Sequence, residues 1–382
     1  MRPTAAGDKL AFASRTDEGT VARALFGAAV LWLVAGAARG QQSFSFAAAA
    51  NGSGFQESAA RSFHREQPPI RIEIGIFPPL PPGFDALTLS GPEIAVPDAA
   101  SHRHTFWIAA VTVVTLLGSA ENSFREEPNQ KFHFTNEGWF GRNTYAGGAD
   151  KASHFVSYYV VAKLLSGVYG ELGLPADQAR LLGAGVSTFA GFITELGDGR
   201  GHYGFSYEDL VMDALGTVTF LGVAHYGLGD LIGFSAGLVP RPRLVCCPYG
   251  GFGTDYTQVI YSGDLKVAGL ARRARFDPGP ARFLLLSLTY GSKGYPFANP
   301  DVRERQIGLF VGVNFVEILR TAGVPEGKWW GKILYFLFDV IRIPYTQIGY
   351  QYDINRGRWH GPSIGDSFPG GAPSAARTLA IQ

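Results

Sequence analysis

The chain has 382 residues, of which 46% are hydrophobic and only 17% charged, and its formal net charge is +1. Ordinary soluble domains carry roughly 25% charged residues, so this composition favours a folded protein that contacts a membrane. The near-zero charge offers no electrostatic attraction for nucleic acid, and we expect no partner of that class. The length leaves room for two domains, or for one large domain with tails.

Residues 1–40 are expected to form an export signal or a membrane anchor. An apolar run occupies residues 24–38 and is shorter than the roughly 20 residues that span a bilayer. A basic flank precedes the run and small residues follow it, which is typical of an export signal cleaved near Ala37 or Gly40. The alternatives are a retained anchor and an ordinary core helix. A signal or an anchor would place the protein in the cell envelope, with the outer membrane among the options.

Residues 41–104 are expected to form a low-complexity linker. Residues 41–69 are rich in Ser, Ala, Gly and Gln, a composition typical of disorder. The alternation of apolar residues predicts one strand at 70–77, which a proline-rich stretch then ends, because proline cannot donate to a ladder.

A domain of apolar helices is expected over residues 105–235. Its first apolar run, at 105–118, is short for a membrane span and fits a buried helix, a pair of strands or a segment at a membrane interface. Apolar residues at three- and four-residue steps predict a helix over 151–169 and another over 178–196. A third helix is predicted to start after Ser206, whose side chain is a suitable cap.

Ionisable side chains lie on these helices where apolar residues are expected. They are Asp150, Lys151 and His154 on the first helix, Glu195 and Asp198 at the end of the second, and Asp209 and Asp213 on the third. Asp150 lies one turn before His154, and we expect it to orient the imidazole. Burial of an unpaired charge costs several kcal/mol, so these groups should be paired, solvated in a pocket or bound to a cation.

Each of these residues also has a plain structural interpretation. Asp150 as the N-cap of its helix would contribute about 1 kcal/mol without any function. A lone histidine on an apolar helix is more often a hydrogen-bonded core residue than a ligand. Together, however, His154, Glu195, Asp209 and Asp213 favour a shared polar pocket. The glycine-rich loop at 197–202 either adds Asp198, Arg200 or His202 to that pocket or is an ordinary turn.

An ordered set of three motifs resembles a known family. GADKASHF at 148–155 is followed by Glu195 and then by an S-x-x-D-x-x-x-D-x-x-G pattern over 206–216. This set resembles the YfiM-type family of predicted periplasmic lipoproteins and, more distantly, VanZ-like membrane proteins. The resemblance implies a site but no reaction, and it places in that site Asp150, Lys151, His154, Glu195, Asp209 and Asp213. The lipoprotein members need a cysteine after the export signal, and this chain has none there.

Residues 236–362 are expected to form an antiparallel β-rich domain, because the hydrophobic period changes to two. The predicted strands lie at 256–261, 265–270, 283–290, 306–315 and 345–352. An apolar helix is predicted at 329–343, a polar turn at 357–362 and a disordered tail at 363–382. The smallest membrane barrels have about eight strands. We therefore predict an α+β fold, a small helical bundle followed by a sheet that packs on it, with a barrel as the alternative.

Three functions fit these features, and the sequence does not decide whether the protein is an enzyme. We expect a non-catalytic envelope protein whose polar pocket has a structural or binding role, with a membrane or lipid as its partner. The alternative is a metal-dependent hydrolase of a lipid- or isoprenoid-linked phosphate, with His154 and Glu195 as catalytic groups. In that case Asp209 and Asp213 would help hold a divalent cation, and Lys151 or Arg200 would meet the phosphate. The third is a membrane protein that handles protons or ions.

Overall fold

The computed structural model describes residues 99–124, 131–238, 256, 259–295 and 303–364. In this part of the chain seven α-helices accompany a seven-stranded sheet, so the predicted α+β class is confirmed. The expected export signal at 1–40, the strand at 70–77 and both cysteines lie outside the described residues, as does nearly all of the expected linker and tail.

The first described helix, α2 (Ala99–Phe124), is longer than the apolar run that predicted it. Polar residues at both ends of the run continue the helix, because they include no proline that would end it. Its window His104–Glu121 is long and apolar enough to cross a membrane by length and composition, and only 6% of that window is buried. The predicted alternative of a strand pair is therefore wrong for this segment.

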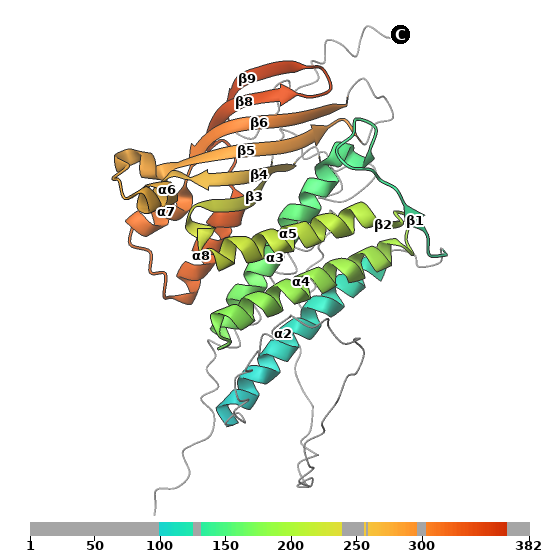
Figure 1. Cartoon of the computed structure of the whole chain (residues 1–382), viewed down its shortest axis with the longest axis vertical. Coiled ribbons are helices and arrows are strands. Elements are labelled where there is room, and N and C mark those ends of the chain that lie inside the picture. Colours follow the sequence, from blue (N-terminus) through green and yellow to red (C-terminus); the bar gives the residue numbers. More distant parts are fainter. Residues whose placement is uncertain (1–98, 125–130, 239–255, 257–258, 296–302, 365–382) are drawn as a thin grey trace, which may run out of the picture.

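Three further helices pack against one another, and the second of them lies along α2 (Figure 1). They are α3 (Ala149–Glu171), α4 (Ala176–Asp198) and α5 (Tyr207–His225), close to the predicted positions. Glycines allow α3 to approach both neighbours closely. A Cβ at Gly216 of α5 would lie 2.2 Å from the carbonyl oxygen of Phe155, and one at Gly183 of α4 would lie 2.7 Å from the backbone nitrogen of Ser166.

A tight turn determines where α3 begins. The 3-10 turn Tyr145–Gly148 places Gly147 and Gly148 at φ values of 62° and 87°, where glycine is favoured. Tyr290 of the sheet donates a hydrogen bond of 2.5 Å to the carbonyl oxygen of Gly147, which anchors the turn. Gly148 is the N-cap, so Asp150 is not the cap that we predicted but lies inside the first turn of the helix.

The large sheet has the strand order β7-β3-β4-β5-β6-β8-β9 and is antiparallel except between β3 and β7. Its strands are β3 (Ile232–Leu238), β4 (Val259–Lys266), β5 (Leu284–Lys293), β6 (Glu304–Val313), β7 (Ile341–Arg342), β8 (Gln347–Asp353) and β9 (Arg358–Ile364). A second, two-stranded pairing joins β1 (Phe134–Thr135) to β2 (Phe205–Ser206). The expected boundary between residues 235 and 236 falls within β3.

Two of the predicted elements in this region are wrong. The strand expected at 265–270 is replaced by the end of β4 and by helix α6 (Val267–Ala274), because Ala268 and Ala271 are buried at helical spacing. The polar turn expected at 357–362 is mostly strand β9, which pairs with β8. The helix expected at 329–343 is confirmed as α8 (Trp329–Val340).

The remaining short elements are α7 (Phe315–Thr321) and the 3-10 turns Leu228–Asp230 and Gly279–Phe283. The helices and the sheet share a core in which Phe155 and Tyr159 of α3 contact Phe234 of β3, with ring centroids 5.0 Å apart in both pairs. This shared core holds the first turns of α3 against the sheet, and the ionisable side chains lie there.

Candidate cation site in the helical region

The cluster forms where α3, α4 and α5 come closest to the loop before α3. Asp150 and His154 lie one turn apart on α3, and Asp209 and Asp213 lie one turn apart on α5, so each pair presents one face. Ser206 caps α5 by accepting a hydrogen bond of 3.3 Å from the backbone nitrogen of Asp209, as predicted. The structure therefore brings together residues from separate parts of the sequence.

Lys151 is fully buried and makes ion pairs with three carboxylates. Its Nζ lies 2.5 Å from Glu137, 2.7 Å from Asp150 and 2.6 Å from Asp209. Burial would lower the pKa of Lys151, but these carboxylates together hold its pKa above the usual value. The ammonium is thus a fixed internal cation that compensates this part of the cluster.

His154 connects the two halves of the cluster. Its Nδ1 lies 2.7 Å from Oδ1 of Asp213, and its Nε2 lies 3.7 Å and 3.8 Å from carboxylate oxygens of Asp150 and Asp209. Burial opposes charge on the imidazole, but Asp209, Asp213 and Asp150 together raise the pKa of His154 well above its ordinary value. With 12% of its side chain exposed, it reaches solvent more than the acids beside it.

Asp150 is held by groups from two regions of the chain. Its Oδ2 accepts from Lys151, and its Oδ1 accepts a hydrogen bond of 2.6 Å from the hydroxyl of Tyr256. Burial alone would raise the pKa of Asp150, but His154 and Lys151 outweigh burial and lower it below the usual value. Asp150 is therefore an ionised, fully engaged carboxylate.

Glu195 has one carboxyl oxygen that makes no hydrogen bond with the described residues. The residue is 1% exposed, and its Oε2 accepts a hydrogen bond of 3.2 Å from the backbone nitrogen of Ser206. Its Oε1 is buried and has no hydrogen-bond partner among the described residues. Burial, reinforced by Asp209 and Asp213, raises the pKa of Glu195 well above normal despite the nearby His154. A buried carboxyl oxygen without a partner is costly unless a proton or another ligand satisfies it.

Sequence reasoning missed three members of the cluster. Glu137 lies in the loop before α3, and although Lys151 donates to it, burial followed by Asp150 and Asp209 raises its pKa to about 8. Glu208 is fully buried and accepts a hydrogen bond of 3.2 Å from the backbone nitrogen of Gly138. Tyr256 comes from the β-rich region. Glu137 and Tyr256 lie outside the predicted helices, and Glu208, in the first turn of α5, could not be told from an ordinary acid at a helix N-terminus.

The residues predicted from the glycine-rich loop lie at the edge of the site. Asp198 ends α4 and is close enough to contribute to the raised pKa of Glu195. Arg200 and His202 are exposed on the loop that follows α4. The loop therefore does not place the guanidinium of Arg200 within the buried cluster.

Two groups of side chains have a geometry suited to a metal ion. Asp150, His154 and Asp209 form one, and His154, Glu195 and Asp213 form the other, with the potential ligand atoms of each group within 4.8 Å of one another. Gly191 of α4 makes room for the second group, because a Cβ there would lie 2.5 Å from Oδ2 of Asp213. The cluster contains more acids than bases, which favours the uptake of a cation or of protons.

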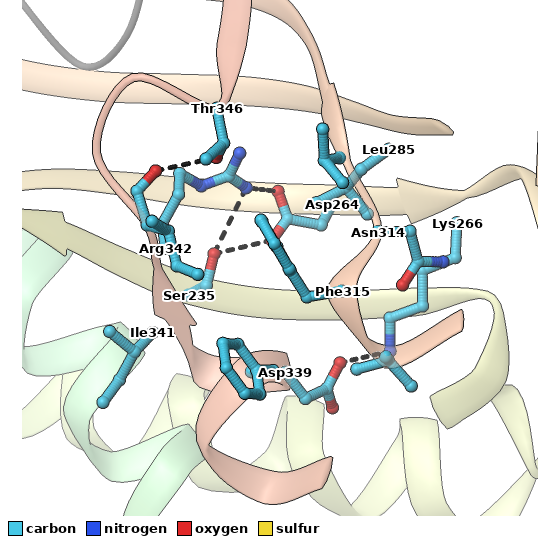
Figure 2. Close-up of a pocket in the computed structure, with 14 residues that line it drawn as sticks. Ser235, Asp264, Lys266, Leu285, Asn314, Phe315, Asp339, Ile341, Arg342 and Thr346 are labelled. Carbon is cyan, nitrogen blue, oxygen red and sulfur yellow. Dashed lines mark hydrogen bonds and ion pairs between the residues drawn. The ribbon is translucent and has the colours of Figure 1, made fainter. Parts of the chain in front are cut away.

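A separate polar pocket lies at the junction of the sheet with α7 and α8 (Figure 2). Arg342 forms an ion pair with Asp264 there, and Ser235 donates a hydrogen bond of 2.6 Å to the same carboxylate. Lys266 forms an ion pair of 2.5 Å with Asp339. The cavity has a volume of about 20 Å³, enough for about one water molecule, and the pair of Lys266 with Asp339 joins β4 to α8.

In the comparison with known proteins, only a segment of the helical region finds a match. Residues 136–223 match the model of a family described as predicted periplasmic lipoprotein (DUF2279). This match includes every member of the cluster except Tyr256, and the description supports an uncharacterised protein of the periplasm or cell envelope. No curated protein and no solved structure matches the chain. The YfiM and VanZ resemblance and the export signal stay predictions.

Proposed function

We propose that this is an envelope protein that binds a divalent cation in the helical pocket beside His154, in a binding or structural role. The observation that carries the proposal is the unsatisfied Oε1 of Glu195, buried beside His154 and Asp213. A proton or a metal ion would satisfy it, and a metal ion would also neutralise the excess of acid around it.

The proposed ligands of the cation are His154 and the acids beside it that do not form an ion pair with Lys151. Lys151 already compensates Glu137, Asp150 and Asp209 through its ion pairs. Glu195 and Asp213 lie within 4.8 Å of the imidazole of His154, and neither makes one of the ion pairs of Lys151. The cation is therefore placed between His154, Glu195 and Asp213, whereas Asp209, which we also predicted as a ligand, belongs to the Lys151 group.

The donor set defines the class of cation. One imidazole with two carboxylates suits a hard or borderline divalent ion such as Mg²⁺, Mn²⁺ or Zn²⁺. Because imidazole must be neutral to coordinate a metal, the ion competes with the protons that His154 and Glu195 hold in its absence. Asp150 and Asp209, which lie 3.7 Å and 3.8 Å from Nε2, support the orientation of the ring.

The same geometry argues against the hydrolase alternative. Lys151 is fully buried and its three partners are carboxylates, so it is not placed to meet a phosphate. Arg200 is exposed and apart from the buried acids. A phosphate substrate would thus lack the basic contacts that the hydrolase hypothesis assigned to these two residues.

Metal content tests the proposal. The full chain is purified in mild detergent without chelator or affinity metal, dialysed against Mg²⁺, Mn²⁺ and Zn²⁺ in turn, and its bound metal is counted by mass spectrometry. We expect near-stoichiometric metal in the parent and loss of it in Glu195→Gln, which keeps the size of the side chain. Asp177→Asn, an exposed change on the same helix α4, is the matched control and should retain the metal. A parent that binds none of the three ions would overturn the proposal.

A further inference from the structure

The sheet has an inverted arrangement of polar and apolar faces. Along β5 and β6 the buried side chains include Ser287, Thr289 and Gln306, whereas Leu288 and Leu309 between them are 57% and 58% exposed. An antiparallel sheet in water normally buries its apolar face and exposes its polar face. Strands with the polar side chains inside and the apolar ones outside are typical of proteins whose outer surface meets lipid.

The exposed apolar residues are in register across neighbouring strands and form one continuous surface. Leu288 pairs with Leu309, which pairs with Tyr350, and all three are exposed. The next row in one direction consists of Leu286, Val311 and Ile348, which are also exposed. We call these two rows, with the aromatic row described next, the outer sheet face.

The order of residue types along the outer sheet face matches the layers of a bilayer. Beyond the aliphatic rows, Ile307 pairs with Tyr352, which pairs with the 62% exposed Trp359. Two residues beyond Ile307 along β6, Arg305 pairs with Ser292, and the neighbouring Glu304 pairs with Lys293. Tyrosine and tryptophan gather where hydrocarbon gives way to headgroups, and charged residues lie beyond. Strands β5 and β6 have 10 residues each, within the roughly 9–11 that cross a membrane as a strand.

Other elements show the same preference for an apolar environment. Helix α2 has the length and composition of a membrane-crossing helix and is little buried. Phe106, Val114 and Leu117 on this helix are more than half exposed. Exposed apolar groups on both a helix and a sheet indicate a lipid environment more than a single small protein contact.

From these observations we propose that the outer sheet face lies against the acyl chains of a lipid bilayer, with the Trp359 row at the headgroup level. The proposal is independent of the cation site, because no member of the His154 cluster belongs to the outer sheet face. Two other occupants would compete with lipid for such a surface. One is a second copy of this chain, and the other is a segment of the chain outside the described residues.

Nitroxide accessibility distinguishes these occupants. The full-length protein, with Cys246→Ser and Cys247→Ser, receives a spin label at Leu309→Cys or Leu288→Cys and is reconstituted in vesicles of phosphatidylethanolamine and phosphatidylglycerol. Collision of the label with oxygen, which concentrates in lipid, is compared with collision with a water-soluble nickel chelate. Asp277→Cys, 82% exposed in a loop, gives the aqueous reference, and the fully buried Leu165→Cys gives the protein interior.

We expect the oxygen collision rate to exceed the nickel rate at both sheet positions, and the ratio to fall at Trp359→Cys. A nickel rate like that of the Asp277 label would show that water covers the face and would overturn the proposal. Low rates for both reagents, as at the Leu165 position, would show that protein covers it and would overturn the proposal equally. Two labelled positions on the face protect the test against a single label that disturbs the fold.

Discussion

At the scale of single residues, the stability of the helical region depends on how buried charges are matched. Lys151 has no exposed side-chain surface, and its ammonium is the only described basic group that touches Glu137, Asp150 and Asp209 as close ion-pair partners. Removing it leaves these carboxylates close together in a buried site, with only the more distant imidazole of His154 beside Asp150 and Asp209 among the described basic groups. Removal of one partner from a buried ion pair costs much more than the pair itself contributes.

We expect Lys151→Met to lower the free energy of unfolding by about 3–5 kcal/mol, because the buried carboxylates lose their partner. Denaturant unfolding in mild detergent measures this. Lys332→Met removes an ion pair between two partly exposed side chains, Lys332 and Glu171, and should cost at most about 1 kcal/mol. Equal effects of the two substitutions would contradict the role given to Lys151.

The pH dependence of stability should reflect Glu137 and His154, together with Glu195, whose pKa is also raised on folding. Their pKa values are raised on folding, Glu137 from 4.5 to about 8 and His154 well above 6.5, so the folded state holds protons that the unfolded state has lost. Stability should therefore fall as the pH rises from about 4.5 towards 8. Thermal unfolding of the metal-free protein measures this fall, which should be smaller in Glu137→Gln. A variant with an unchanged profile would contradict the assignment to Glu137.

At the scale of elements, the close contact of α3 with α5 positions His154 opposite Asp213. Gly216 permits this contact, since a Cβ there would lie 2.2 Å from a carbonyl oxygen of α3. Gly222 is on the same helix, and a Cβ there would meet nothing within 4 Å. The two glycines thus offer a matched pair of substitutions.

We expect Gly216→Ala to destabilise the protein by about 1–3 kcal/mol, because the helices must separate to admit the methyl group. It should also weaken cation binding, since His154 and Asp213 move apart. Gly222→Ala should stabilise α5 by up to about 1 kcal/mol and leave binding unchanged. Unfolding and metal titration of the two variants test this, and similar behaviour of both would contradict the close-contact role.

The elements that the sequence predicted well are those with a strong period. The helices α3, α4 and α5 and the strands β5, β6 and β8 were predicted close to their observed positions, because their apolar residues repeat at helical or strand spacing. The stretch at 265–270 was predicted wrongly, because a short apolar segment fits either period. The start of α3 also depended on the backbone of Gly147 and Gly148, which a cap rule based on Asp150 does not detect.

At the scale of the whole molecule, the candidate site draws on both regions of the chain. The ionisable residues on helices could be predicted, since each is an exception to an apolar pattern. Tyr256 could not, because its contact with Asp150 joins positions 106 residues apart in the sequence. The polarity of the sheet faces also needed the structure, because a period of two does not say which face is covered.

If the outer sheet face meets lipid, the free-energy cost of a charged substitution on it should depend on how deep in the bilayer the substituted residue lies. We expect Leu309→Lys to lower stability in vesicles by about 2–4 kcal/mol, and Trp359→Lys, in the aromatic row, by about 0–1 kcal/mol from the charge. Denaturant unfolding in phospholipid vesicles gives both values. A water-exposed face would accept lysine at Leu309 with little change, which would contradict the lipid assignment.

The most direct test of the central claim, that a cation binds beside His154 in exchange for protons, is calorimetric titration of the metal-free protein at two pH values and in buffers of different ionisation enthalpy. We predict that cation binding releases protons and tightens as the pH rises, because His154 and Glu195 must lose protons to coordinate the ion. We also expect Glu195→Gln to abolish the binding. Binding without proton release, or binding that persists in Glu195→Gln, would contradict this claim.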